Sequence, residues 1–159
     1  MVLVYLGLGS NIGDKAARIK EALDRLGGIV TIKRVSPLYL TEPVDLKDQP
    51  WFINCVAEVE TEKKPEELLS SVQSIEKAMG RKKTKEKGPR PIDIDLLFYD
   101  TQVVNQKNLV IPHPRLHTRL FVLQPMMDLN PQYVHPVLRK TIQELYNEQP
   151  WAEIVTPYK

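Results

Sequence analysis

Two aspartates, Asp93 and Asp95, carry the strongest chemical signal in this sequence. Side chains alternate along a strand, so the two carboxylates share one face, with roots roughly 6.5–7 Å apart at about 3.3 Å rise per residue. Unpaired carboxylates this close repel, and a hard divalent cation such as Mg²⁺ relieves the repulsion. Two of them can hold two ions against a polyphosphate. A solvated face of an edge strand is the alternative. The opposite face is expected to carry Ile92, Ile94, Leu96 and Phe98.

A basic run, Arg81–Arg90, directly precedes these acids and carries six positive charges and one negative. A charge run alone is usually a solvated loop, but this one delivers Arg90 beside the carboxylates. The planar guanidinium group donates two parallel hydrogen bonds to phosphate oxygens. The composition also favours a mobile loop that covers a polyphosphate.

A second basic cluster lies in the segment Ile111–Arg119, with His113 and Arg119 among its titratable and charged side chains. Prolines restrict its backbone, and a helix is expected to follow, so an anion site is predicted here. A structural histidine is the alternative reading for each histidine taken singly. The single cysteine, Cys55, stands in an apolar run and is expected to be a buried hydrophobe.

Several nucleotide and catalytic motifs are absent. The sequence has no Gly-x-x-x-x-Gly-Lys-[Ser/Thr] phosphate loop, and the glycines of Gly7–Gly13 have the wrong spacing for a dinucleotide fingerprint. Neither Gly-x-Ser-x-Gly nor His-Glu-x-x-His occurs. A nucleotide bound by this chain would therefore be held by cationic side chains and metal ions.

The elements that position these groups alternate in a recognisable order. Apolar patterns predict strands and helices in the order β-α-β-β-α-β, which is an α+β fold with a ferredoxin-like antiparallel sheet and helices packed on one face. The other face is left for the active site. The expected strands are Val2–Leu6, Ile29–Leu40 with a break near Ser36-Pro37, Phe52–Glu60 and Ile92–Tyr99; the expected helices follow Asp14 and Pro65.

Additions are expected after this core. They comprise a hairpin near Asp100–Val104, a helix around Arg119–Leu129 and a final helix from Thr141, where Glu144 completes a capping box. The segment Thr41–Pro50 contains prolines and charges and is expected to be a loop.

Length and composition indicate one domain spanning residues 1–159. With 42% hydrophobic and 26% charged residues, the chain has the composition of a soluble globular protein. No membrane-length apolar run or signal-peptide pattern occurs, so a cytoplasmic protein without membrane contact is expected. A net charge of +2 gives no global field for nucleic acid.

Four motifs in order carry a family resemblance: Gly7–Asp14, Gly88–Leu97, Ile111–Arg115 and Arg119–Pro125. Together they resemble the hydroxymethyldihydropterin pyrophosphokinases, from residue 2 to about 145. The resemblance implies ATP as co-substrate, two Mg²⁺ ions, 6-hydroxymethyl-7,8-dihydropterin as acceptor and AMP as product, in folate biosynthesis. It also implies small-molecule substrates only, no nucleic acid, and action as a monomer.

The resemblance assigns roles to individual residues. Asp93 and Asp95 would ligate magnesium and, with Arg81 and Arg90, form the catalytic set. The ATP-binding set would be Leu69, Gln73, Glu76, Arg81, Lys83, Arg90, His113 and Arg119. The pterin-binding set would be Thr41, Glu42, Pro43, Val44, Phe52, Asn54, Asp95 and Phe121.

For the pterin, Phe52 and Phe121 would act as two plates around the flat ring, and Asn54 would read its polar edge. Without the resemblance, both phenylalanines would be read as core residues. The sequence departs from the family pattern at Lys87, where an aromatic residue is common. A nucleic-acid-binding module and a nucleotide-sensing domain without turnover remain the competing interpretations.

Overall fold

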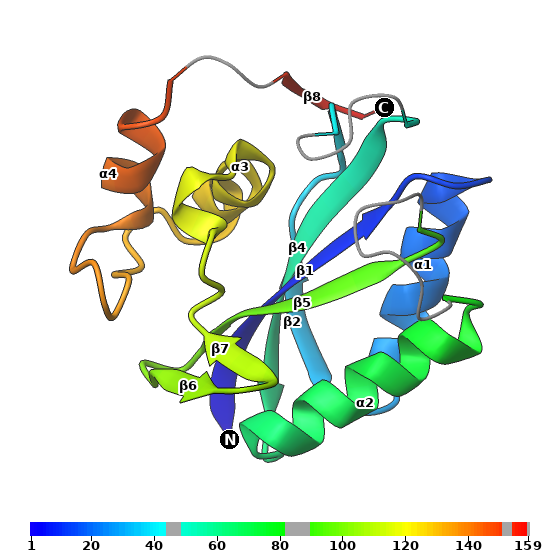
Figure 1. Ribbon diagram of the computed structural model, residues 1–159, viewed down its shortest axis with the longest axis horizontal. Helices are drawn as coiled ribbons and strands as arrows, with labels where there is room; N and C mark the ends of the chain where they lie inside the picture. Colours follow the sequence, from blue (N-terminus) through cyan, green and yellow to red (C-terminus); the bar gives the residue numbers. More distant parts are fainter. Residues whose placement is uncertain (44–48, 82–89, 151–153, 159) are drawn as a thin grey trace.

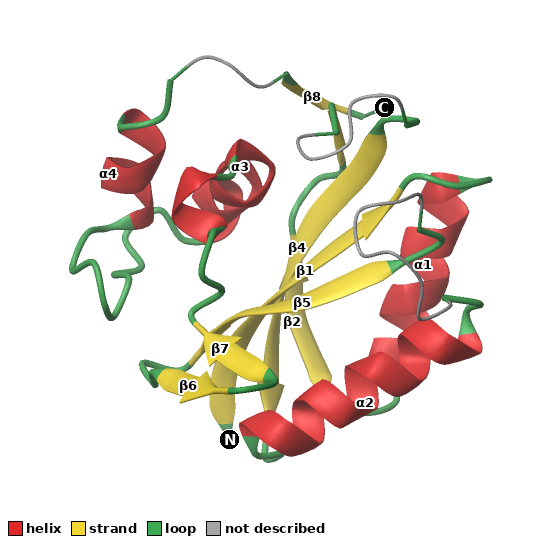
Figure 2. Ribbon diagram, viewed as in Figure 1, coloured by secondary structure: helices red, strands yellow, loops and turns green. Residues whose placement is uncertain are grey.

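The computed structural model describes residues 1–43, 49–81, 90–150 and 154–158. A twisted sheet runs through the middle of the molecule, with two helices on each side (Figure 1). Figure 2 shows the same arrangement by element type, with the small β6–β7 hairpin beside the end of the main sheet. The main-sheet strands are β1 (Val2–Ser10), β2 (Thr31–Val35), β3 (Tyr39–Thr41), β4 (Phe52–Thr61), β5 (Asp93–Tyr99) and β8 (Val155–Pro157).

The main sheet is antiparallel and has the order β5-β1-β4-β3-β8, with β2 also paired to β4. The expected second strand is broken as predicted, into β2 and β3, around Ser36-Pro37. Strand β8 was not expected from the sequence. It pairs with β3 and so adds the end of the chain to one edge of the sheet.

Helices α1 (Lys15–Leu26) and α2 (Pro65–Ala78) cover one face of the sheet. The Asp14 carboxylate accepts a hydrogen bond from the Ala17 N–H at 3.2 Å, which confirms the predicted cap of α1. Ile19 and Leu26 of α1 and Val72 of α2 lie in the apolar core between these helices and the sheet.

Helices α3 (Leu120–Leu129) and α4 (Ile142–Asn147) pack on the opposite face. Helices therefore lie on both faces, because the C-terminal additions cover part of the face that the sequence left open. The predicted capping box of α4 is present: the Thr141 hydroxyl accepts from the Glu144 N–H, and the Glu144 carboxylate accepts from the Thr141 N–H. The described residues include no helix long and apolar enough to span a membrane.

The alternation of β5 departs from the sequence prediction at Phe98. Leu96 pairs with Leu6 and Phe98 with Tyr5, so Leu97 is an extra residue in the ladder, a β-bulge. Leu96 faces α1 and α2 as expected, but Phe98 lies in the cluster beneath α3. The prediction that Phe98 shares the face of Ile92, Ile94 and Leu96 was wrong because the bulge reverses the pleat.

The hairpin after β5 lies slightly later than predicted. It is formed by β6 (Val104–Gln106) and β7 (Leu109–Ile111), and a short 3₁₀ turn (Leu116–Thr118) leads into α3. Cys55 is buried in the core, and burial raises the pKa of its thiol to about 12, as expected for a structural cysteine.

Candidate active site

A pocket lies on the α3 side of the sheet, over the end of the central strand β1. Its floor is formed by Gly7 and Gly9, which lie on this face because β1 alternates. In the ladder, Gly9 lies between Asp93 of β5 and Asn54 of β4, and Gly7 lies next to Asp95. The glycines leave a hollow between the acids on one strand and the aromatic and amide groups on the other. The lining residues are Gly7, Leu8, Gly9, Thr41, Glu42, Pro43, Gln49, Phe52, Asn54, Cys55, Val56, Arg90, Asp93, Asp95, Leu97, Arg119, Phe121 and Val122.

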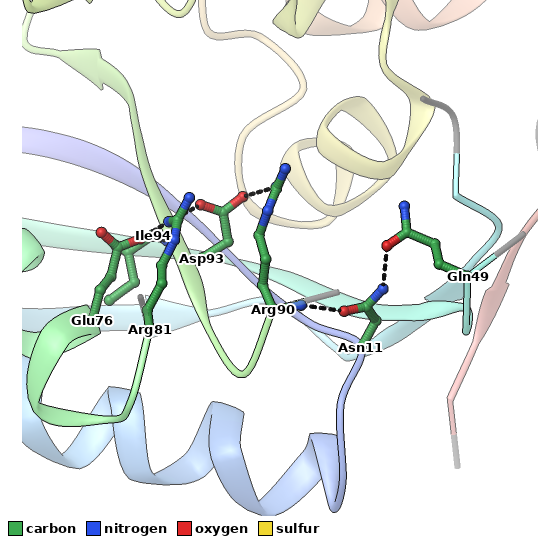
Figure 3. A network of polar contacts seen from close by, with 7 residues as sticks. All are labelled: Asn11, Gln49, Glu76, Arg81, Arg90, Asp93 and Ile94. Carbon is green, nitrogen blue, oxygen red and sulfur yellow. Dashed lines mark hydrogen bonds and ion pairs between the residues drawn. The ribbon is translucent and has the colours of Figure 1, made fainter. Parts of the chain in front are cut away.

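Two arginines meet the carboxylate of Asp93 (Figure 3). Arg81 Nη1 donates to Oδ1 at 2.7 Å, and Arg90 Nη1 donates to Oδ2 at 3.0 Å. Arg81 also donates to Glu76 Oε2 at 2.5 Å, and the same Glu76 oxygen accepts from the Ile94 N–H at 2.8 Å. The end of α2 and the start of β5 are thereby joined through one buried carboxylate.

Asp95 projects from β5 into the same pocket, as its spacing from Asp93 predicts. Burial raises the pKa of the Asp95 carboxyl, and the negative charges of Asp93 and Glu76 raise it further, against the opposing effects of Arg119 and Arg81. An additional positive charge close to Asp95, beyond those of Arg119 and Arg81, would favour the ionised form of its carboxyl group. This end of the pocket therefore concentrates negative charge that a cation would stabilise.

The opposite end of the pocket is lined by aromatic and amide side chains. Asn54 is 8% exposed, and its Nδ2 donates to Thr41 Oγ1 at 2.7 Å. This bond fixes the amide so that Oδ1 lies over Gly9, on the pocket floor. Phe52 begins β4 and Phe121 lies in the first turn of α3, and both line the pocket. The Arg119 guanidinium carbon lies 5.4 Å from the centre of the Phe121 ring.

Thr41, Glu42 and Pro43, which the family resemblance assigns to pterin binding, also line this end. Glu42 is tied to the C-terminal strand: its N–H donates to the Ile154 carbonyl at 3.2 Å, and its Oε1 accepts from the Ile154 N–H at 3.0 Å. Val44 and Lys83 lie outside the described residues.

Some predicted ATP-binding residues lie outside the pocket lining. Leu69 packs against the main core, Gln73 is an exposed residue of α2, and Glu76 contacts Arg81 and β5. His113 lines a separate groove beside the β6–β7 hairpin. Burial, with the nearby positive charge of Arg119, lowers the pKa of His113 to about 4, so this side chain is neutral near pH 7.

Sequence reasoning missed three contributors to the pocket and its network. Gly7 and Gly9 form the pocket floor. The sequence signal for this role was their spacing of two within a strand, which puts both on one face; it was not a nucleotide-binding motif. Asn11 follows β1 in the same motif and binds the backbone on both sides of the site, although its side chain is not part of the pocket wall. Its role was visible only after the segments around Pro50 and Arg90 were placed in space.

The donor set suits magnesium. Among the described residues, no group of three histidine, cysteine or acidic side chains could hold a metal ion by itself. Asp93 and Asp95 offer hard oxygen donors on one wall, and Mg²⁺ typically takes one or two carboxylates and completes its coordination with phosphate oxygens and water. The arrangement therefore fits an ion that arrives with a polyphosphate.

Comparison with known proteins agrees with this geometry. Residues 5–131 match the model of the family described as 7,8-dihydro-6-hydroxymethylpterin-pyrophosphokinase. The chain belongs to this family. The match includes the part of β1 that carries Gly7 and Gly9, the Asp93/Asp95 pair and Phe121, so every residue that lines the pocket lies within the pyrophosphokinase match.

Two relatives of very different length are similar to this chain. A 2-amino-4-hydroxy-6-hydroxymethyldihydropteridine pyrophosphokinase of Aquifex aeolicus is 38% identical over 148 residues, covering 93% of this chain and 92% of that protein. The folic acid synthesis protein fol1 of Schizosaccharomyces pombe is 47% identical over 150 residues, covering 93% of this chain. This chain spans only 20% of the length of that second relative.

Solved structures of this pyrophosphokinase fold are similar in shape. The crystal structure of Plasmodium falciparum HPPK-DHPS, wild type with SDX-DHP, aligns with a TM-score of 0.73 at 22% sequence identity. The alignment covers 93% of this chain and 43% of that one. At this level of identity, the likeness is one of fold.

Proposed function

We propose that this chain transfers a pyrophosphoryl group from ATP to 6-hydroxymethyl-7,8-dihydropterin, giving the pterin diphosphate and AMP, in folate biosynthesis. The observation that supports this proposal is one pocket whose two ends differ in chemistry. Asp93, Asp95 and Arg90 gather at one end and Phe52, Asn54 and Phe121 at the other. Arg119 lies beside the Phe121 ring and also acts electrostatically on Asp95. A pyrophosphokinase of this family joins a highly charged donor to a flat heterocycle, and the two ends match these two substrates.

At the heterocycle end, Phe52 and Phe121 would cover the two faces of the pterin ring. Asn54 would select its polar edge. Because its Nδ2 already donates to Thr41, the amide presents its Oδ1 acceptor to the pocket, which suits a ring N–H or amino donor. An aromatic ring without such a donor would leave Oδ1 buried and unpaired, so it would bind less well.

At the charged end, Arg90, Arg81 and Arg119 would bind the triphosphate. In the structure, Arg81 and Arg90 each bind one oxygen of Asp93. Guanidinium groups held beside a metal-binding carboxylate lie close to the phosphates that the metal would bring. Together they would offset the charge on the transferred group, which is most of what a protein contributes to this kind of reaction.

Asp93 and Asp95 are the residues that would hold magnesium, and the proposal includes two ions. When bound, magnesium supplies charge neutralisation and orients the triphosphate. In the reaction, the pterin hydroxyl oxygen forms a bond to the β-phosphorus, the bond between that phosphorus and the bridging oxygen breaks so that AMP leaves with this oxygen, and the hydroxyl proton passes to solvent. The pocket would hold the two reacting atoms together and exclude water.

The nucleoside would lie beyond this end, towards α2. Leu69 and Gln73 lie on that helix, and its C-terminal end leads directly to Arg81. Glu76 would act on ATP through Arg81, which it holds. His113, as a neutral side chain, and Lys83 complete the proposed ATP-binding set.

The proposal extends to the architecture and location of this chain. The strand order β5-β1-β4-β2, reached through two β-α-β passages, is consistent with a ferredoxin-like core. One sheet carries both apolar clusters, which supports a single domain over residues 1–159. The proposal also includes action as a monomer, as the family resemblance implies. ATP as co-substrate and a free cysteine are consistent with a cytoplasmic location.

Product analysis tests the proposal. Purified protein is incubated with magnesium, ATP and 6-hydroxymethyl-7,8-dihydropterin, and the nucleotides are separated. We expect AMP that forms only when the pterin is present, in equal amount to the pterin diphosphate. ADP would indicate a different kinase, and no product with retained nucleotide binding would indicate a sensing domain.

A further inference from the structure

Strand β3 contributes to the pterin end of the pocket and lies between β4 and β8 in the sheet. On the β4 side, Thr41 pairs with Phe52, and its Oγ1 accepts from Asn54 Nδ2 at 2.7 Å. On the other side, Thr41 pairs with Val155 of β8. A strand at a sheet edge leaves a row of backbone groups unpaired, and β8 pairs with this row of β3. Strand β8 therefore supports the strand that carries Thr41 and orients Asn54.

Glu42 makes the last link between β3 and the segment of β8. In the register of this ladder, Glu42 lies opposite Ile154, and its N–H donates to the Ile154 carbonyl at 3.2 Å. In a regular ladder, the return bond would run from the Ile154 N–H to the Glu42 carbonyl. Here the Ile154 N–H donates to Glu42 Oε1 at 3.0 Å. The carboxylate thus replaces a backbone acceptor directly before Pro43, which has no N–H to continue the ladder.

The acceptor in this link is charged, and the charge strengthens the hydrogen bond from a backbone N–H. Glu42 is half-buried and lines the pocket together with Thr41 and Pro43. Its carboxylate is therefore bonded to the segment of β8, while its backbone belongs to the pocket wall. At the other end of the ladder, the Tyr158 N–H donates to the Leu38 carbonyl at 2.8 Å, so β8 is held at both ends.

We propose that Glu42 is a positioning residue: by binding Ile154, it holds the Thr41–Pro43 wall against β8 and so raises the affinity for the pterin. The inference rests on the proposed function, since it takes this end of the pocket as the pterin end. The carboxylate acts through the backbone of the wall and does not contact the ring. Residues 154–158 lie outside the family match of residues 5–131, so this support comes from a part of the chain to which that match assigns no role.

Steady-state kinetics of AMP formation measure this effect. The KM for 6-hydroxymethyl-7,8-dihydropterin is determined at saturating magnesium and ATP, and the KM for ATP at saturating pterin. Glu42→Ala removes the acceptor, and Ile154→Pro removes the donor N–H without changing Glu42. We expect each variant to raise the KM for the pterin about three- to tenfold, within the value of one hydrogen bond, and to leave the KM for ATP within about twofold.

Two conservative variants are the matched controls. Glu42→Gln keeps an acceptor oxygen, and Ile154→Ala keeps the N–H while shortening a side chain that is 48% exposed. Both should keep the KM for the pterin within about twofold of the wild-type value, because the hydrogen bond survives. The double variant of Glu42→Ala and Ile154→Pro should have the KM of either single variant, since both changes break the same bond.

Three results would overturn the inference. A wild-type KM for the pterin in Glu42→Ala would show that the wall does not depend on this bond. A raised KM in Glu42→Ala but not in Ile154→Pro would mean that the carboxylate contacts the pterin directly. Equal rises in the KM for the pterin and for ATP, with lower thermal stability, would indicate a general structural role. If Ile154→Pro does not fold, the contrast between Glu42→Ala and Glu42→Gln decides the question.

The wild-type protein separates this inference from the proposed function. Pterin-dependent AMP formation by the wild type, together with any of these three results, leaves the proposed function standing and removes only the role of Glu42. Absence of AMP in the wild-type reaction contradicts the proposed function itself, and the inference with it.

Discussion

Gly9 and Asn54 lie opposite each other in the β1–β4 ladder, and the Asn54 side chain occupies the space that a side chain at Gly9 would need. A Cβ built on Gly9 would lie 2.4 Å from Asn54 Oδ1 and 3.6 Å from Phe52 Cδ1. The glycine is therefore required by a close approach across the sheet.

Gly9→Ala should displace the Asn54 amide and break its bond to Thr41. We expect pterin affinity to fall at least about tenfold, the loss of roughly one good hydrogen bond to the ligand. Gly28→Ala is the control away from the pocket, since its Cβ would meet only the Arg25 carbonyl oxygen, at 3.4 Å. Isothermal titration with the pterin compares the two. Equal affinities in both variants would contradict this role of Gly9.

Asp95→Asn should abolish most turnover while leaving the fold intact. The change keeps the shape of the side chain but removes an anionic ligand for magnesium, and electrostatic groups of this kind are worth about 10²–10³ in rate. AMP release under saturating magnesium is the measurement, with circular dichroism as the check on folding. A near-normal rate would remove Asp95 from the catalytic set.

Stability below pH 6.5 should depend on His113. Its pKa is lowered from 6.5 to about 4, first by burial, so the unfolded chain binds a proton in this range before the folded protein does. Stability from this group is complete above pH 6.5 and is lost as the pH falls towards 4. His113→Gln should therefore lose less unfolding free energy between pH 7 and 4.5 than the wild type, by on the order of 2 kcal/mol.

Denaturant titrations at the two pH values measure this difference. His117→Gln, a neighbour in the same groove, is the control. Parallel pH profiles for His113→Gln and the wild type would show that the environment of His113 does not disfavour its charged form.

Glu58→Ala should destabilise the protein by about 2–4 kcal/mol. The Glu58 carboxylate accepts from Tyr5 Oη at 2.7 Å and from Arg34 at 3.0 and 2.9 Å, and Arg34 also donates to the Leu129 carbonyl at 2.6 Å. The network joins β1, β2 and β4 to the end of α3, so its loss leaves several groups unpaired.

The more exposed ion pair between Lys33 of β2 and Glu60 of β4 provides the comparison. Its Nζ and Oε1 atoms lie 3.1 Å apart. Lys33→Ala should change the unfolding free energy by less than about 1 kcal/mol, as is usual for surface ion pairs. A similar loss in both variants would mean that the Glu58 network contributes no more than a surface contact.

Local signals predicted much of this fold. The Asp14 cap, the Thr141/Glu144 capping box, the break at Ser36-Pro37 and the shared face of Asp93 and Asp95 all follow from short-range chemistry, and the structure has each of them. Such features depend on neighbours in the sequence, which are visible without coordinates.

Features that depend on distant partners were missed. Strand β8 forms by pairing with β3 at the edge of the sheet. Its three residues are too few to give a sequence pattern that predicts a strand. The bulge at Leu97 is defined by its pairing with β1, and the role of Asn11 by two loops far apart in the chain. For the site, residue types predicted the shared face of the two acids, only the family resemblance pointed to Phe52 and Phe121, and the glycine floor required the register of three strands.

The bulge at Leu97 places two consecutive side chains of β5, Leu97 and Phe98, on the α3 face of the sheet. Upstream, the acids must face α3; downstream, Phe98 must reach the aromatic cluster with Tyr5 and Tyr133. Removing Leu97 would leave Leu96 opposite Leu6 and Phe98 opposite Tyr5 in a regular ladder, so Asp95 and Phe98 would both stay on the α3 face, and the Leu97 side chain would be lost from the cluster there. A one-residue deletion between Asp93 and Asp95 would have a different effect, because it would place the two acids on opposite faces of the sheet.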